Sequence, residues 1–190
     1  METLPERILN LKKDNFSIVF FGILLVLSRY YFSMSVNYMY FGVVLILLGV
    51  IAELYPYFSK IKRFSKAELA TIDQMKGIEF EEYMAFLLEK LGYVKPKVTQ
   101  AYGDQGIDII AQKDDVKLGI QCKRWKKKVG NKAVQEVHAG IGYYSLDKAV
   151  VVTNSYFTDS AIQLAEKLDI DLWDRTDLTK LLEQVKKQAK

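Results

Sequence analysis

The sequence predicts a mixed α/β domain preceded by a transmembrane helical hairpin. Two observations support this fold class. The stretch from Asn15 to Ala52 is apolar, with Arg29 as its only charged residue. After Ser65 the chain instead mixes both charge signs with apolar residues at helix-like and strand-like spacing. We therefore expect a cytoplasmic N-terminal segment (1–15), a transmembrane hairpin (16–55), a basic juxtamembrane linker (56–74) and a folded domain (75–190).

Two apolar segments form the predicted hairpin. Residues 16–32 and 36–52 are each 17 residues long, which is the lower limit for a helix that crosses a bilayer. Residues 33–35 leave room only for a tight turn, and a chain in lipid must satisfy its own backbone hydrogen bonds, which favours paired helices. Tyrosines that suit a lipid–water interface flank both segments: Tyr30, Tyr31, Tyr38, Tyr40, Tyr55 and Tyr57.

Positive charges predict the orientation of the hairpin. They precede the first segment and follow the second: Arg7, Lys12 and Lys13, then Lys60, Lys62, Arg63 and Lys66. Both termini should therefore be cytoplasmic, with two spans in the cell (inner) membrane. A cleaved signal peptide is one alternative, although no small-residue cleavage site follows the first segment. A pair of buried core helices is the other, although each segment is apolar on every face.

The composition of the chain excludes several kinds of site. The net charge is +4, but residues 1–66 hold eight Lys or Arg against four Asp or Glu, whereas residues 67–190 hold nineteen of each. Overall basicity therefore does not indicate nucleic-acid binding, and only a local patch could do so. Cys122 and His138 are the only residues of their types, which excludes an intrachain disulfide and a zinc site with several Cys and His ligands.

The folded domain should begin with one helix and three strands. A short helix opened by a capping box at residues 65–68 is expected in the linker. Apolar residues then recur at helical spacing over residues 77–91, and Gly92 supplies a stop. Three strands should follow, at residues 94–102, 107–112 and 116–123, with Asp114-Asp115 as the hairpin turn between the last two.

The remainder of the domain should alternate helices with strands. We expect a helix at 132–144, a strand at 148–153, a helix at 159–168, a short strand at 170–173 and a helix at 179–187. The complete order is αβββαβαβα. Because only the later strands alternate with helices, this order predicts a mixed sheet with helices on both faces.

The predicted hairpin would bring three polar side chains together. If the two aspartates form a two-residue turn, counting outward places Asp108 opposite Gln121, with Cβ atoms about 4.5–5.5 Å apart. Lys123 projects to the same side as Gln121 because strand side chains alternate. A carboxylate and an amide oxygen suit Mg²⁺, and a cation beside a metal-activated water suits phosphodiester hydrolysis. A solvated sheet face is the alternative that this spacing alone leaves open.

Five motifs together resemble the Mrr-type catalytic domain of the PD-(D/E)xK nuclease superfamily, over about residues 75–178. They are Gly77-Ile-Glu-Phe-Glu-Glu-Tyr83, Leu87-Leu-Glu-Lys-Leu-Gly-Tyr93, Gly103-Asp-Gln-Gly-Ile-Asp-Ile109, Ile120-Gln-Cys-Lys123 and Val151-Val-Thr-Asn154. Each motif alone is weak, but their order and spacing both match. The resemblance implies a restriction-endonuclease-like αβββαβ core, which agrees with the element order predicted above.

The resemblance implies roles for individual residues. Asp108, Gln121 and the helical Glu81 would bind Mg²⁺, for which Mn²⁺ could substitute, and Lys123 would orient or activate the attacking water. Glu79 and Glu82 are alternative helical carboxylates that point elsewhere on the helix. Gln121 departs from the superfamily pattern because an amide replaces a carboxylate, which weakens one metal ligand. This QxK form is characteristic of Mrr-like members.

Two further groups of residues extend the predicted site. Asp104 and Gly106 would shape the turn before Asp108, and a direct metal or substrate role is the alternative. A basic run begins at Lys123 and could seat phosphates, with Trp125 available for stacking; a solvated loop is the alternative. The predicted DNA-binding residues are Arg124, Trp125, Lys126, Lys127, Lys128, Lys132 and Gln135.

These interpretations predict a membrane-anchored, Mg²⁺-dependent endodeoxyribonuclease that acts in defence against foreign DNA, as the resemblance to type IV restriction implies. Its partners would be DNA and the lipid bilayer, and whether it forms a homodimer stays open. Two other functions remain. The domain could be a catalytically inactive, membrane-tethered DNA-binding or sensing module, which Gln121 would favour, or a membrane protein that binds only protein partners.

Overall fold

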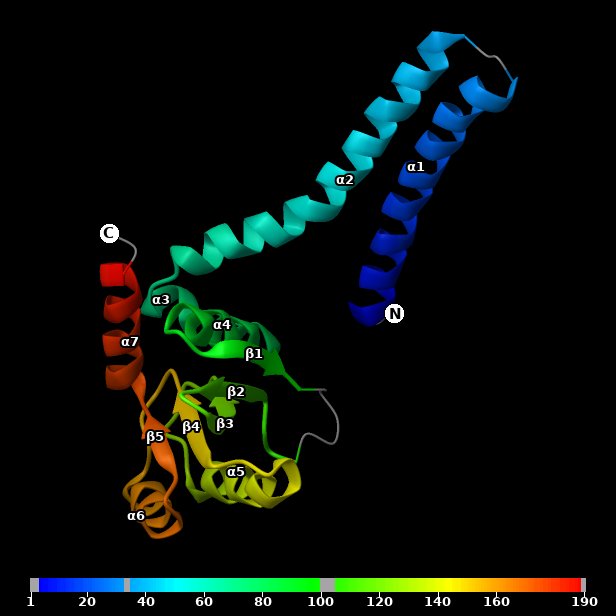
Figure 1. The fold of residues 1–190 in the computed structure, drawn as a ribbon. Coiled ribbons are helices and arrows are strands. Elements are labelled where there is room, and N and C mark those ends of the chain that lie inside the picture. Colours follow the sequence, from blue (N-terminus) through cyan, green and yellow to red (C-terminus); the bar gives the residue numbers. More distant parts are fainter. Residues whose placement is uncertain (1–3, 33–34, 100–104, 189–190) are drawn as a thin grey trace. The chain divides into compact units, whose positions relative to one another are not determined.

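The computed structural model describes residues 4–32, 35–99 and 105–188 (Figure 1). The chain divides into two compact units, Met1–Lys66 and Ala67–Lys190. The first unit contains helices α1 (Leu4–Phe32) and α2 (Val36–Ser65). The second unit contains a sheet with its covering helices and carries all the predicted site residues.

Helices α1 and α2 approach each other closely at two glycines. A Cβ atom added to Gly22 of α1 would lie 2.8 Å from the carbonyl oxygen of Gly42 on α2. Small residues allow this approach of two backbones, as they do between helices in membranes. Among the described residues, α2 is long and apolar enough to cross a membrane, with a mean hydropathy of 2.0, whereas the apolar part of α1, Ser17–Phe32, is shorter.

The second helix continues well beyond the end predicted from the sequence. Our expected linker began at residue 56, but Pro56 lies inside α2, which ends only at Ser65. The proline removes one backbone hydrogen bond, and α2 nevertheless continues through it. The expected turn at residues 33–35 lies largely outside the described residues, although Ser35 caps α2 by accepting a hydrogen bond from the Asn37 amide.

The predicted capping box at residues 65–68 is not formed. The Ser65 hydroxyl donates to the carbonyl of Lys62, within the last turn of α2. The short helix α3 (Leu69–Ile72) has Glu68 at its N-cap, and no side chain caps it. The two residues therefore belong to different elements, because α2 extends as far as Ser65.

A five-stranded mixed sheet forms the centre of the second unit. Its order is β1 (Val94–Val98), β2 (Ile109–Lys113), β3 (Val116–Lys123), β4 (Lys148–Thr153) and β5 (Asp171–Trp173). The pairs β1–β2 and β2–β3 are antiparallel, and β3–β4 and β4–β5 are parallel. The predicted mixed sheet is therefore confirmed.

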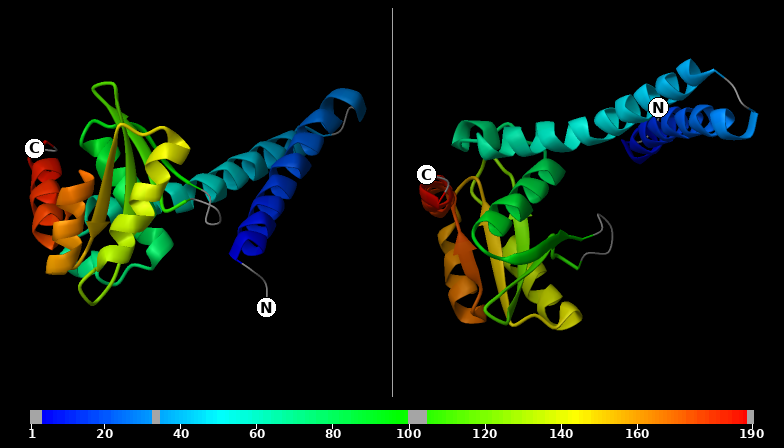
Figure 2. Two further views of the ribbon diagram at one scale, coloured as in Figure 1. Left: turned by 90° about the horizontal axis from the view of Figure 1, so that it is seen from below. Right: turned by 45° about the horizontal axis from the view of Figure 1, so that its top comes forward.

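Helices cover both faces of this sheet (Figures 1 and 2). Helix α4 (Gly77–Lys90) lies on one side and buries Phe80, Tyr83, Met84, Leu87 and Leu88. Helices α5 (Asn131–Tyr144) and α6 (Asp159–Leu168) lie on the other side. The core between these two helices and the sheet includes Ile107, Val134, Val137, Val151, Phe157 and Ala161.

The hairpin between β2 and β3 has the predicted two-residue turn. Asp114 and Asp115 both have positive φ, 50° and 63°, as a type I′ turn requires. Lys113 pairs with Val116, so the predicted register is confirmed. Strand β2 begins at Ile109, however, and not at residue 107. Strand β1 is also shorter than expected: it ends at Val98, and residues 100–102 of the expected strand lie outside the described residues.

Helix α7 (Arg175–Gln188) begins four residues earlier than predicted. The Asp174 carboxylate accepts hydrogen bonds from the amides of Thr176 and Asp177, at 2.7 and 3.3 Å. The Asp177 carboxylate in turn accepts one from the Asp174 amide, at 3.2 Å. This reciprocal arrangement is a capping box built from two aspartates, and the sequence reasoning overlooked it.

Candidate active site

Asp108 lies directly before β2 and is bound to the neighbouring strand. The Cys122 backbone amide on β3 donates a hydrogen bond to Asp108 Oδ2, with a length of 2.6 Å. The first residue of β2, Ile109, pairs with Ile120 on β3. Asp108 therefore lies immediately before the first paired residue of β2. The Asp108 carboxylate is therefore held against the β3 backbone between Gln121 and Lys123.

Gln121 and Lys123 on β3 meet at Glu136 on α5. The Gln121 Nε2 atom donates to Glu136 Oε2 over 3.0 Å, and Lys123 Nζ lies 2.9 Å from the same oxygen. Gln121 is 3% exposed, and its other polar atom, Oε1, is buried with no hydrogen-bond partner among residues 4–32, 35–99 and 105–188. Such an atom is costly to leave unpaired, so it indicates a place where a ligand could bind.

Glu136 is held in its charged form by its partners. Partial burial works against ionisation, but the hydrogen bond and charge of Lys123 outweigh it, aided by Gln121 and Lys132, and the pKa of Glu136 is lowered. The Lys132 ammonium is 3.7 Å away, and its side chain is 88% exposed. Solvent screens such a pair, so Lys123 is the main charge partner of Glu136.

Two carboxylates lie close to the buried Cys122. Burial raises the pKa of the Cys122 thiol well above its ordinary value, and the charges of Asp108 and Glu81 raise it further, while Lys123 lowers it. Glu81 comes from α4, on the other side of the sheet from Glu136. The charges acting on the Cys122 thiol therefore place both carboxylates near the C-terminal end of β3.

Gly106 allows the loop before Asp108 to pack closely against α5. It has a φ of +79°, a conformation that side-chain-bearing residues rarely adopt. A Cβ atom at this position would also overlap the backbone carbonyl of Glu136. The predicted turn residue thus keeps the Asp108 loop in direct contact with the helix that carries Glu136, whereas Asp104 lies outside the described residues.

The predicted DNA-binding residues divide into two groups. Trp125, 55% exposed, and the exposed Lys126, Lys127, Lys128, Lys132 and Gln135 face solvent. Arg124 instead turns inward: its Nη1 atom donates to the Asp73 carbonyl oxygen over 3.5 Å, and its Nε atom is buried with no hydrogen-bond partner in the described part of the chain. A small pocket of about 110 Å³ lies beside the first group and is lined by Lys123, Trp125, Val129, Gly130, Lys132, Ala133 and Glu136.

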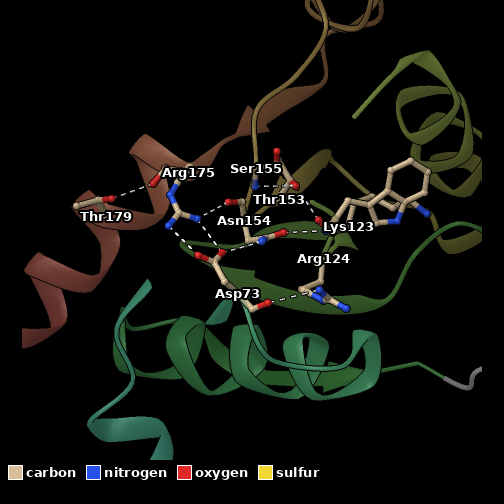
Figure 3. Close-up of polar contacts among 9 residues, drawn as sticks. Asp73, Lys123, Arg124, Thr153, Asn154, Ser155, Arg175 and Thr179 are labelled. Atoms are coloured by element: carbon tan, nitrogen blue, oxygen red, sulfur yellow. Dashed lines mark hydrogen bonds and ion pairs between the residues drawn. The ribbon is translucent and has the colours of Figure 1, made fainter. Parts of the chain in front are cut away.

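A polar network centred on Asp73 joins four separate parts of the chain (Figure 3). Asp73 follows α3, and both its carboxylate oxygens accept hydrogen bonds from Arg175 at the start of α7, at 2.7 and 2.8 Å. Asn154, directly after β4, donates to Asp73 from Nδ2 over 2.8 Å. The hydrogen bond from Arg175 is the main reason that the pKa of Asp73 is lowered.

This network, which we call the Asp73 network, holds the chain that leaves β3. The Asn154 Oδ1 atom accepts a hydrogen bond from the Trp125 amide, at 2.8 Å. The Thr153 hydroxyl donates to the Lys123 carbonyl, at 2.6 Å. The backbone on both sides of Arg124 is therefore fixed, and with it the direction in which the basic run leaves the site (Figure 3).

Sequence reasoning missed Glu136, for which a signal was present. Ala133, Val137 and Gly140 are buried on the face of α5 that packs toward the sheet. Residue 136 lies three residues after Ala133 and four before Gly140, on the edge of this face. Gln135, which we selected from the resemblance, is exposed. The Asp73 network had no comparable local signal, because its members are distant in the sequence.

The comparison with protein families agrees with this geometry. The model of the family Mrr_cat, described as restriction endonuclease, matches residues 72–182, which is more than half of the chain. The chain belongs to this family. The Mrr_cat match includes the whole sheet, Glu136 and the Asp73 network, and it excludes α1 and α2. Membership points to nuclease activity.

The chain is also similar to a solved structure. The crystal structure of a protein of unknown function, AF1548, is 23% identical, with a TM-score of 0.48, over 55% of this chain. This chain spans 64% of the length of that protein. No curated protein matches the chain.

Nucleases of the restriction-endonuclease type generally use divalent metal ions, and the residues of this Mrr_cat domain fit such an ion. Within the described ranges, no three His, Cys, Asp or Glu side chains come together in a way that could hold a metal. The oxygen atoms available to an ion are instead those of the Asp108 carboxylate and the Oε1 atom of Gln121, which has no hydrogen-bond partner in the part of the chain that the structure describes. Both are hard oxygen ligands of the kind that Mg²⁺ and Ca²⁺ prefer.

Proposed function

We propose that the chain is a membrane-anchored, divalent-metal-dependent DNA endonuclease that hydrolyses phosphodiester bonds and acts in defence against foreign DNA. The observation that carries this proposal is the buried Oε1 atom of Gln121, which has no hydrogen-bond partner among the described residues. Gln121 and Lys123 lie on β3, and the Asp108 carboxylate accepts a hydrogen bond from the Cys122 amide between them. The family supports nuclease chemistry.

Each residue of the candidate site has a distinct role in the proposed reaction. Asp108 and Gln121 would hold the metal, with Glu81 approaching from α4, and Lys123 would hold the attacking water next to the phosphate. When bound, a divalent cation polarises the phosphate and lowers the pKa of a coordinated water. The exposed lysines of residues 126–128, with Lys132, would seat the neighbouring phosphates. Trp125 would stack on a base.

The first unit supports the proposed membrane anchor. Only 11% of the most apolar window of α2 is buried, whereas a core helix of a soluble protein would be mostly buried. Leu47, Leu48 and Ile51 are each more than half exposed. Large exposed apolar surfaces of this kind suit a lipid environment. In the proposed arrangement α1 is a second, shorter span, and both termini are cytoplasmic because the flanking charges are positive.

A cleavage assay on the full-length chain in detergent tests the proposed activity. Supercoiled plasmid should be nicked or linearised with Mg²⁺ or Mn²⁺, and chelation with EDTA should stop the reaction. Asp108→Ala and Lys123→Ala should abolish cleavage, because one removes a metal ligand and the other removes the cation beside the attacking water. Matched controls on exposed strand positions, Asp171→Ala and Lys148→Ala, should cleave like the wild type.

Two outcomes would contradict the assignment. Full activity in the Asp108 and Lys123 variants would mean that cleavage occurs elsewhere or comes from a contaminant. Salt-dependent DNA binding without any metal-dependent cleavage would instead favour the second candidate, an inactive, membrane-tethered DNA-binding or sensing module. The amide at position 121, in place of a carboxylate, is the feature that favours this second function.

A further inference from the structure

Glu136 is the point at which the side chains of β3 are fixed. Its Oε2 atom accepts from Gln121 Nε2 over 3.0 Å and pairs with Lys123 Nζ over 2.9 Å. Gln121 is buried, and 24% of the Lys123 side chain and 31% of the Glu136 side chain are exposed. One carboxylate oxygen thus contacts two of the four side chains assigned to the proposed reaction, and this carboxylate comes from a different element of the fold.

The carboxylate of Glu136 determines which way the Gln121 amide faces. An ionised carboxylate can only accept hydrogen bonds, so the amide must turn its NH₂ group toward Glu136. The carbonyl oxygen, Oε1, then points away from Glu136, where it is buried and unpartnered. Without Glu136, nothing in these contacts would distinguish the two orientations of the amide.

The backbone of Glu136 is fixed as well as its side chain. Gly106 packs against its carbonyl so closely that a Cβ atom would not fit. The same glycine lies two residues before Asp108. Glu136 is therefore set between the loop that carries Asp108 and the strand that carries Gln121 and Lys123, so its position depends on both halves of the candidate metal site.

We propose that Glu136 is a positioning residue that directs the Gln121 carbonyl oxygen toward the metal and holds the Lys123 ammonium beside it. This inference rests on the proposed function, since it requires a metal at Asp108 and Gln121. It also explains how an amide can serve at position 121. The carboxylate of Glu136, on α5, brings a negative charge next to the site. This carboxylate needs a hydrogen-bond donor at position 121, which the glutamine amide provides and a second carboxylate would not.

Mn²⁺ binding to the full-length chain in detergent, measured by electron paramagnetic resonance without DNA, tests this proposal. Glu136→Ala should weaken Mn²⁺ binding about 10-fold or more, the usual effect of removing a group that orients a metal ligand. Glu136→Gln, which can still accept a hydrogen bond through its own carbonyl, should recover part of the loss. The matched controls Glu166→Ala and Glu166→Gln, at an exposed position on α6, should bind Mn²⁺ like the wild type.

DNA binding without metal separates positioning from a general structural role. Loss of a negative charge near the basic run should leave DNA affinity unchanged or slightly increased in Glu136→Ala. In the cleavage assay, kcat should fall while KM for DNA stays the same. If Glu136→Ala unfolds, it will lose DNA binding, Mn²⁺ binding and the tryptophan fluorescence of the folded protein together. Glu136→Gln then provides the test: it must lose Mn²⁺ affinity while it still binds DNA, or the proposal fails.

The outcomes distinguish this inference from the proposed function. Wild-type Mn²⁺ affinity in both Glu136 variants, combined with a loss in Asp108→Ala, would overturn the role of Glu136 and leave the metal site intact. Absence of Mn²⁺ binding in the wild type, or binding that Asp108→Ala does not affect, would overturn the metal site itself, and the role of Glu136 with it.

Discussion

Gln121 shows how one side chain can combine two functions. Its amide nitrogen donates to the charged Glu136, and its oxygen, which has no hydrogen-bond partner among the described residues, is the proposed metal ligand. A glutamate at this position would face Glu136 with a second carboxylate. Like charges at hydrogen-bond distance in a mostly buried site raise the pKa of one group strongly. The pairing of Gln121 with Glu136 therefore avoids a repulsion that a pair of carboxylates would create.

An exchange of the two residues tests this pairing. We expect Gln121→Glu alone to lower the melting temperature and the Mn²⁺ affinity, because two carboxylates would then meet beside Lys123. The double variant Gln121→Glu/Glu136→Gln restores one donor and one acceptor, so it should regain most of both properties. The wild type, Gln121→Glu, Glu136→Gln and the double variant form a double-mutant cycle. Differential scanning fluorimetry and Mn²⁺ titration on these four proteins measure the coupling energy between residues 121 and 136. Additive losses would show that the residues act independently.

At the scale of elements, the Asp73 network holds the ends of four segments together. The loop after α3, the ends of β3 and β4 and the start of α7 all meet at Asp73 and Asn154 (Figure 3). Asn154 is 4% exposed and joins Asp73 to the Trp125 amide. Because parallel β3 and β4 end side by side, this network controls where the chain goes after Lys123.

Removal of the Asp73 charge should destabilise the second unit and do so in a pH-dependent way. We expect Asp73→Asn to lower the free energy of unfolding at pH 7 by about 1–2 kcal/mol, because hydrogen bonds to charged groups contribute about 1.5–3 kcal/mol and solvent screens this partly exposed pair. Arg175 lowers the pKa of Asp73. In the unfolded chain the pKa of Asp73 is about 4, and in the folded protein it is lower. The charge of Asp73 therefore stabilises the fold fully above the unfolded pKa, and this stabilisation is lost as the pH falls through the folded pKa.

Intrinsic fluorescence can measure this effect in the full-length chain. Trp125 and Trp173 are the two tryptophans of the chain, and both lie in the second unit. Urea unfolding of the wild type and Asp73→Asn should therefore show a difference at pH 7 that shrinks below pH 4. Asp171→Asn, at an exposed position on β5, is the control. A difference that did not change with pH would mean that the Asp73 charge is not the source of the stability.

For the whole molecule, the central question is whether the chain crosses a membrane and, if it does, how many times. The Mrr_cat match begins at residue 72 and includes neither α1 nor α2. Helix α2 alone satisfies the length and hydropathy required of a span among the described residues. Two spans would place both termini on one side, whereas a single span would place them on opposite sides.

Epitope tags at the two ends can distinguish these arrangements. With two spans and cytoplasmic termini, both tags should be inaccessible to antibody or protease in intact bacterial cells from which only the outer membrane has been removed. Both should become accessible after lysis. If one tag were accessible before lysis, the chain would cross the membrane once. Recovery of the chain in the soluble fraction would rule out the anchor.

Local patterns determined most of the second unit. The Asp114-Asp115 turn, the exact span of β3 and the helix over Gly77–Lys90 follow from turn chemistry, alternation and helical spacing, and each of these acts within about fifteen residues. The same turn sets the register that brings Asp108 next to Gln121. Short-range patterns were less useful at the ends of elements, as the extension of α2 through Pro56 and the early start of α7 show.

The sequence by itself thus determined the order of the elements, the hairpin register and the choice of candidate residues directly before β2 and on β3. Only the tertiary structure decided that Glu136 pairs with Gln121 and Lys123, that Arg124 turns inward, and that Asp73, Asn154 and Arg175 meet. The physical reason is the range of the interactions. Turns and periodicities are local, but these contacts join residues from 13 to 102 positions apart and form only once α5 and α7 pack beside the sheet.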